Sequence, residues 1–129
     1  MEELKIEYVD INELKAYEKN AKLHDKKQVD QIVKSIQQFG MNDPIGVWKD
    51  NVVVEGHGRL MACKKMGMKK VPIIRLEHMS DEERRAYVLV HNQLTMATGW
   101  DSELLEEELV DIDEIDMLDF GFELDFDFS

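Results

Sequence analysis

Residues 52–65 constrain the fold most, because a strand pattern, a tight turn and a helix pattern follow one another there without a gap. Three consecutive valines are typical of a buried strand, and Gly56 and Gly58 then permit a tight turn. A helix is predicted to follow over residues 60–66. The start of a helix presents unpaired N–H groups and a partial positive charge, so this turn is suited to an anionic ligand such as phosphate.

The turn supplies several candidate site residues. Its phosphate-binding candidates are Gly56, His57, Gly58 and Arg59. The Arg59 guanidinium can form a bidentate contact with phosphate, and His57 offers a further donor. Glu55 is the acid beside the turn and the candidate for a catalytic role. The same pattern is also compatible with a plain strand-to-helix turn that leaves Arg59 on the protein surface.

The rest of the chain predicts a small α+β domain with short strands and interleaved helices. Strands are predicted over residues 4–9, 44–48, 51–55 and 71–76. Further helices are predicted over residues 25–40, 80–95 and 101–110, and the first two begin with capping-box pairs. Trp100 is expected to dock the last of these helices onto the core.

The charge distribution divides the chain into two parts. Residues 1–99 hold all 16 Lys and Arg residues beside 15 of the 28 acidic ones, so this part is nearly neutral. Residues 100–129 hold the other 13 acids and no Lys or Arg. We therefore predict a domain over residues 1–110 and an acidic tail over residues 111–129, which is either a packed amphipathic segment or a disordered one.

Residues 52–76 resemble the central box of the ParB/sulfiredoxin-like superfamily, the ParB-like nuclease domain. Residues 19–24 with 28–47 are similar to the opening box of that family, and residues 91–105 to its asparagine-bearing helix and Gly-Trp-Asp turn. The resemblance thus covers roughly residues 5–110 in order, which is more specific than any one motif. The most similar version is the one found ahead of DNA-methyltransferase domains in phage and mobile-element proteins.

The resemblance implies a nucleotide pocket that takes CTP or ATP. Residues 56–59 match the turn that cradles phosphates in ParB, and Asn92 matches the family asparagine. His91 stands where ParB has a metal-ligating glutamate, which argues against Mg²⁺ dependence. Asn20 and His24 belong to the opening box, which lies near the nucleotide in this family.

The resemblance further implies a DNA-associated accessory of a phage or mobile element, with DNA or a DNA-modifying protein as partner. NTPase activity, nuclease activity and the oligomeric state stay open. Two alternatives are a kinase for a free amino acid, with Glu55 as base, and a non-catalytic module that works through its acidic tail. No apolar run is long enough for a membrane span, and Cys63 is a single cysteine, so a cytoplasmic protein is expected.

Overall fold

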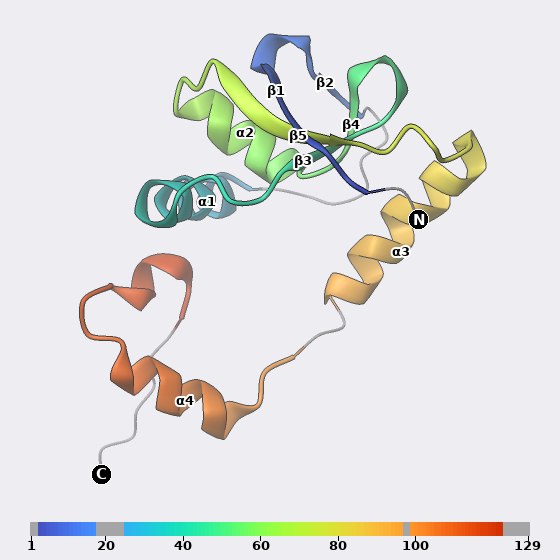
Figure 1. The fold of residues 1–129 in the computed structure, drawn as a ribbon. Coiled ribbons are helices and arrows are strands. Elements are labelled where there is room, and N and C mark those ends of the chain that lie inside the picture. Colours follow the sequence, from blue (N-terminus) through green and yellow to red (C-terminus); the bar gives the residue numbers. More distant parts are fainter. Residues whose placement is uncertain (1–2, 18–24, 97–98, 123–129) are drawn as a thin grey trace.

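The computed structural model describes residues 3–17, 25–96 and 99–122. Within these ranges five strands form one mixed sheet in the order β1-β5-β3-β4-β2 (Figure 1). The strands are β1 (Ile6–Asp10), β2 (Lys15–Ala16), β3 (Ile45–Val47), β4 (Val52–Glu55) and β5 (Lys70–Arg75). The pairs β1–β5 and β3–β4 are antiparallel, whereas β3–β5 and β2–β4 are parallel. The predicted α+β class is confirmed.

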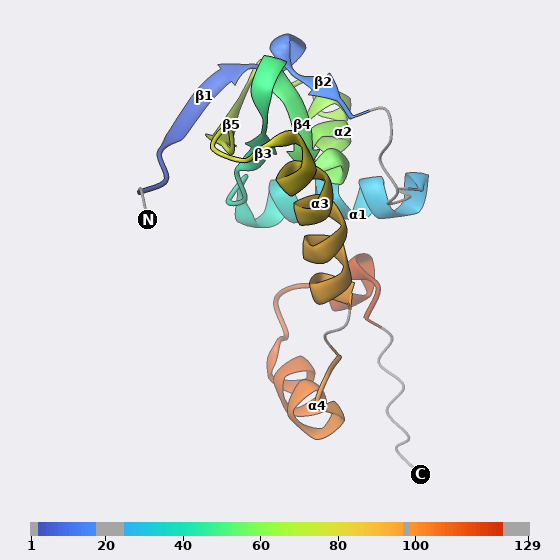
Figure 2. The same cartoon turned by 90° about the vertical axis from the view of Figure 1, so that its right-hand side faces the viewer.

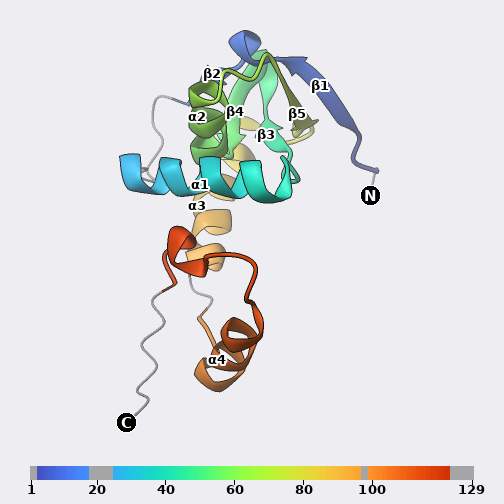
Figure 3. The same cartoon turned by 90° about the vertical axis from the view of Figure 1, so that its left-hand side faces the viewer.

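The α-helices of the described residues are α1 (Lys26–Phe39), α2 (His57–Lys65), α3 (Asp81–Met96) and α4 (Ser102–Asp111). Short 3₁₀ helices are η1 (Ile11–Glu13), η2 (Lys49–Asn51) and η3 (Met117–Phe120). In Figure 3, α1 runs across the molecule below α2, and η3 lies beyond α1 on the side away from the sheet. In Figure 2, α3 extends away from the sheet toward α4.

The core has two parts because successive residues of a strand point to opposite faces of the sheet. On one face, Val53 and Ile73 pack in a cluster with Leu60 and Cys63 of α2. On the other face, Val54 belongs to a second cluster with Val88 of α3. The sheet thus lies between α2 and α3, and residues at the end of β4 can be reached from both helices.

The structure confirms several elements that were predicted from local sequence signals. The Asp25 side chain accepts a hydrogen bond from the Gln28 N–H at 2.7 Å, and Ser80 and Glu83 form their reciprocal capping box. In the turn between β3 and β4, Asp50 adopts a positive φ of 59°, which aspartate and asparagine tolerate better than most residues.

Other expectations need correction. Helix α2 begins at His57 rather than at Leu60, because Gly56 already ends the strand as the helix N-cap. The two-residue strand β2 was not predicted, since it is too short to show any alternation.

The prediction for Trp100 is wrong. Its side chain is 72% exposed and packs edge-on against Phe122, with ring centroids 5.8 Å apart, instead of reaching the sheet. Helix α4 and η3 lie apart from the sheet in Figure 1, and η3 contacts α1. None of residues 111–122 is buried, so the nature of the acidic tail and the domain boundary at residue 110 both stay predictions.

None of the helices formed by the described residues combines the length and the apolar character that crossing a membrane requires.

Side chains buried at the centre of the sheet are expected to contribute most to the stability of the fold, and a substitution of Ile73 tests this expectation. Ile73 is fully buried, whereas Ile6 on the neighbouring strand is 61% exposed. Ile73→Ala is expected to lower the free energy of unfolding by about 2–5 kcal/mol, because it removes buried methyl groups and leaves a cavity. Urea denaturation measures the change. The control Ile6→Ala should cost well under half as much, and equal losses for the two variants would contradict this account of the core.

Candidate functional site

The site begins at the junction of β4 and α2, where the backbone turns at Gly56. Gly56 has a φ of 94°, in the left-handed region that glycine adopts without steric cost. A Cβ atom added at Gly56 would lie 2.8 Å from Nη2 of Arg59, so the guanidinium lies directly against the bare Cα. The guanidinium of Arg59 and the N-terminus of α2 therefore lie next to each other at this turn.

A cleft of about 220 Å³ opens beside this junction, where α1, the start of α2 and α3 meet. Six of the nine predicted site residues line it: Glu55, Gly56, Gly58, Arg59, His91 and Asn92. The remaining lining residues, Gln28, Ile32 and Thr95, were not predicted. They come from α1 and α3, and their approach to the turn depends on helix packing that no local pattern reveals.

The carboxylate of Glu55 joins three side chains around the cleft. Its Oε2 accepts a hydrogen bond from the Tyr87 hydroxyl at 2.8 Å. Its Oε1 lies 3.3 Å from His91 Nε2 and 3.7 Å from Arg59 Nη2. Glu55 therefore connects the end of β4 with α2 and with the middle of α3.

Tyr87 is a site residue that the sequence reasoning missed. Its ring stacks on that of His91 with centroids 5.4 Å apart. Burial, reinforced by the hydrogen bond to Glu55, raises the pKa of Tyr87 to about 12. Its spacing of four residues from His91 was the available signal, because residues i and i+4 share one face of a helix.

His57 lies away from the cleft lining. Its side chain is buried, and its Nε2 accepts a hydrogen bond from the Tyr17 N–H at 3.2 Å. The contact connects the start of α2 to the chain that leaves β2, so in this conformation His57 has a structural role. Its predicted contact with phosphate stays a prediction, and Asn20 and His24 lie outside the described residues.

The described residues offer no group of three or more His, Cys, Asp or Glu side chains placed to hold a metal ion. At the cleft, the Glu55 carboxylate is already engaged by three side chains, and an imidazole is a poor ligand for Mg²⁺. These residues do not fit a protein-bound Mg²⁺. Cys63 is fully buried and desolvation raises its thiol pKa, which disfavours the reactive thiolate.

A sequence model of the ParB N-terminal domain matches residues 1–93. The chain belongs to this family. It is also 40% identical over 84 residues to the ParB-like nuclease domain-containing protein YnaK of Escherichia coli K12, a match that covers 65% of this chain and 97% of YnaK.

Three solved structures share the fold of this ParB N-terminal domain. Truncated Caulobacter crescentus ParB in complex with CTP-γ-S has a TM-score of 0.67 at 19% identity, and the match covers 83% of this chain and 63% of ParB. A pNOB8-like ParB N-domain has a TM-score of 0.57 at 26% identity, covering 86% of this chain and 44% of that one. A free serine kinase mutant in complex with AMP has a TM-score of 0.51 at 22% identity, and the match covers 62% of this chain and 34% of the kinase. This chain thus spans less than two thirds of each solved chain.

The raised pKa of Tyr87 predicts a pH dependence at the site. Because the folded-state pKa of about 12 exceeds the ordinary value of 10.0, the neutral phenol stabilises the folded state below about pH 10. That contribution is lost as the pH rises through about 12. Tyr87→Phe should remove the late-titrating component from an absorbance titration of phenolate. The control Tyr8→Phe, at a residue 68% exposed, should leave that component intact. Loss of it in the control would contradict the assignment.

Proposed function

We propose that this chain is a nucleotide-binding domain whose cleft takes the phosphates of CTP or ATP against residues 56–59. The observation that carries the proposal is the bare Cα of Gly56 at the N-terminus of α2, with the Arg59 guanidinium beside it. The absence of a side chain at Gly56 lets the Arg59 guanidinium lie against the turn, and the helix N-terminus and Arg59 together supply N–H donors and positive charge for a phosphate.

The size of the cleft indicates which part of a nucleotide it holds. Its volume of about 220 Å³ is below the ~300 Å³ at which typical ligand pockets begin, so it suits phosphates and an adjoining ribose. The side chains of Asn92, Thr95 and Gln28 offer hydrogen-bonding groups for that ribose. We propose that Asn20 and His24 contact the rest of the nucleotide, as the family resemblance implies.

The engagement of Glu55 favours binding over catalysis. A general base needs a carboxylate free to accept a substrate proton, whereas Glu55 already accepts from Tyr87 and lies near His91 and Arg59. This arrangement disfavours the amino-acid kinase alternative and offers no support for hydrolysis by Glu55. In this proposal Glu55 holds Arg59 and α3 in place around the ligand.

We further propose that the domain works in the cytoplasm as an accessory to DNA or to a DNA-modifying protein, in a phage or mobile element. The likeness to a chromosome-partitioning ParB and to the ParB-like nuclease domain-containing protein YnaK supports the association with DNA, whereas the phage or mobile-element setting rests on the family resemblance alone. The near-neutral charge of residues 1–99 permits contact with DNA, which the overall net charge of −12 would otherwise oppose.

A thermal-shift assay with CTP, ATP, GTP and ADP tests the nucleotide proposal. A ligand that binds only the folded state at about 100 times its Kd stabilises it by about 2.7 kcal/mol, which raises the melting temperature. A shift with CTP or ATP is the expected result. A melting temperature that none of the four nucleotides changes would overturn the proposal.

Arg59→Lys is expected to weaken nucleotide binding by about tenfold to a hundredfold, although the charge is kept. A lysine cannot form the bidentate contact, and a hydrogen bond to a charged group is worth about 1.5–3 kcal/mol. Isothermal titration calorimetry measures the affinity. The matched control is Arg85→Lys on the exposed side of α3, where 56% of the side chain is accessible. Equal affinities for the two variants would show that Arg59 does not contact phosphate.

Nucleotide affinity is expected to depend little on Mg²⁺, and His91→Glu should create such a dependence. The new carboxylate would lie beside Glu55, and Mg²⁺ prefers paired oxygen ligands. Binding is measured with and without Mg²⁺. His78→Glu serves as the control, because it makes the same change in an exposed loop. Strong Mg²⁺ dependence in the unmodified protein would contradict the expected role of His91.

A further inference from the structure

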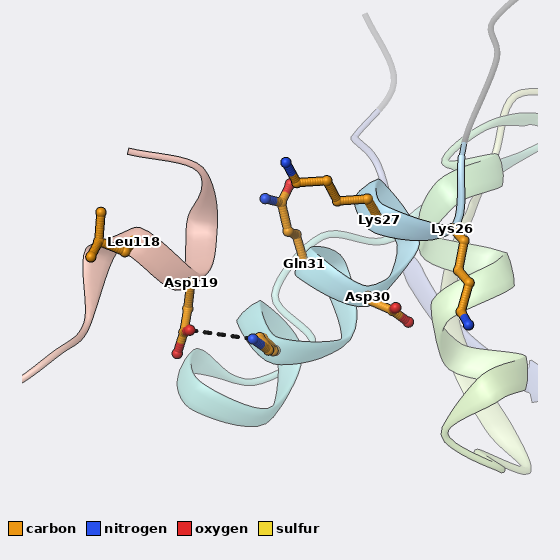
Figure 4. Close-up of a pocket in the computed structure, with 7 residues that line it drawn as sticks. Lys26, Lys27, Asp30, Gln31, Leu118 and Asp119 are labelled. Carbon is orange, nitrogen blue, oxygen red and sulfur yellow. Dashed lines mark hydrogen bonds and ion pairs between the residues drawn. The ribbon is translucent and has the colours of Figure 1, made fainter. Parts of the chain in front are cut away.

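A second and larger cleft lies between α1 and η3, away from the nucleotide site. Its volume is about 560 Å³, and Figure 4 shows its lining residues on the two facing segments. The α1 side carries Lys26, Lys27, Asp30, Gln31 and Lys34, and the η3 side carries Leu118 and Asp119. A helix face rich in lysine thus meets the segment over residues 101–122, whose charged side chains are all acidic and which we call the acidic segment.

Few contacts hold the acidic segment against α1. Lys34 Nζ lies 3.3 Å from Asp119 Oδ1, the pair drawn as a dashed line in Figure 4. The rings of Phe39 and Phe120 lie 5.8 Å apart at the end of α1. The side chains of Lys34 and Asp119 are 51% and 47% exposed, and ion pairs this exposed are weak and sensitive to salt. The segment can therefore be displaced by a stronger anion.

Of the three lysines of α1 that line the cleft, only Lys34 is paired by this contact, which leaves Lys26 and Lys27 without a neutralising partner in the acidic segment. Among the described residues, Lys26 and Lys27 have no carboxylate within ion-pair distance, and Asp30 is bonded to Lys65 of α2. The segment over residues 101–122 carries ten acids and no base. The α1 face therefore keeps excess positive charge next to a segment with excess negative charge.

We propose that the face of α1 that carries Lys26, Lys27 and Lys34 binds the phosphate backbone of duplex DNA, and that the acidic segment over residues 101–122 competes for this face. This proposal rests on the DNA association proposed above and identifies the surface of the protein that contacts DNA. It does not involve the residues that line the nucleotide cleft.

The geometry of α1 favours a duplex as the competing anion. At 1.5 Å of rise per residue, Lys26 and Lys34 lie about 12 Å apart along the helix axis, and both reach the same cleft. A duplex carries phosphates at short regular intervals along its axis, so the two lysines can contact separate phosphates of one duplex. Lysine contacts to phosphate carry no base information, so this binding is insensitive to DNA sequence.

Two charge-reversal variants of the full chain separate displacement of the segment from a change in net charge. Asp119→Lys replaces the ion pair with repulsion against Lys34, whereas Glu107→Lys makes the same net change on the exposed surface of α4. Fluorescence anisotropy measures binding to a short labelled duplex at about 50 mM and about 200 mM salt. Asp119→Lys should bind at least threefold more tightly than Glu107→Lys, with a steeper loss at the higher salt concentration.

Lysine removal then locates the surface. In the Asp119→Lys background, the combined changes Lys26→Gln, Lys27→Gln and Lys34→Gln should abolish the gain. Changing Lys5, Lys69 and Lys70 to Gln removes the same charge from exposed positions outside the cleft and should keep most of it. Nucleotide affinity is measured for every variant and should stay unchanged.

The outcomes separate the hypotheses. Equal DNA affinities for Asp119→Lys and Glu107→Lys, or equal losses in the two lysine triples, would overturn the α1 surface and leave the DNA association standing. Absence of DNA binding in every variant would overturn the DNA association itself, while nucleotide binding is judged separately. Heparin that binds as tightly as the duplex would show a site for any polyanion and would also overturn the proposal for DNA.

Discussion

The arrangement of the site depends on the contacts that the Glu55 carboxylate makes with Tyr87, His91 and Arg59. Helix α3 extends away from the sheet, so few apolar contacts hold its second half, and His91 and Asn92 lie in that half. The hydrogen bond that Tyr87 donates to Glu55, with His91 Nε2 3.3 Å from the same carboxylate, holds this part of the helix beside the turn at Gly56. Gly46 on β3 allows this placement, because a Cβ atom there would lie 2.9 Å from Cβ of Glu55.

The first turn of α3 is held by a buried cation. Arg84 is 5% exposed, and its guanidinium lies 4.7 Å from the ring centroids of both Tyr17 and Trp48. Its Nη2 donates to Asp81 at 2.7 Å, while Nε and Nη1 have no hydrogen-bond acceptor among the described residues and lie beside this aromatic pair. Burial of a charge costs free energy, and the ring quadrupoles with Asp81 offset that cost. Arg84 thus holds the first turn of α3, and Glu55 holds the middle of this helix. The cleft lies next to Glu55, between α3 and α1.

The sequence predicted the parts of the site that depend on local rules. The strand, the glycine turn and the arginine can be recognised because each is set by neighbours a few residues away, and six cleft residues follow from them and from the family resemblance. Tyr87 was missed because its partner, Glu55, is 32 positions away and only the packing of α3 on the sheet brings them together. The burial of His57 depends in the same way on Tyr17, 40 positions away. Trp100 was misplaced because a large aromatic next to a helix is typical of docking, whereas here Phe122 supplies its partner.

Helix α1 connects the two surfaces for which we have proposed ligands. Gln28 and Ile32 line the cleft beside Gly56, while Lys34 and Phe39 contact the acidic segment. The two surfaces use different side chains of this helix, so a phosphate beside Gly56 and an anion beside Lys34 can be bound at the same time. The exposed ion pair of Lys34 with Asp119 is the contact that an anion at the second surface has to replace, and exposed ion pairs contribute little free energy.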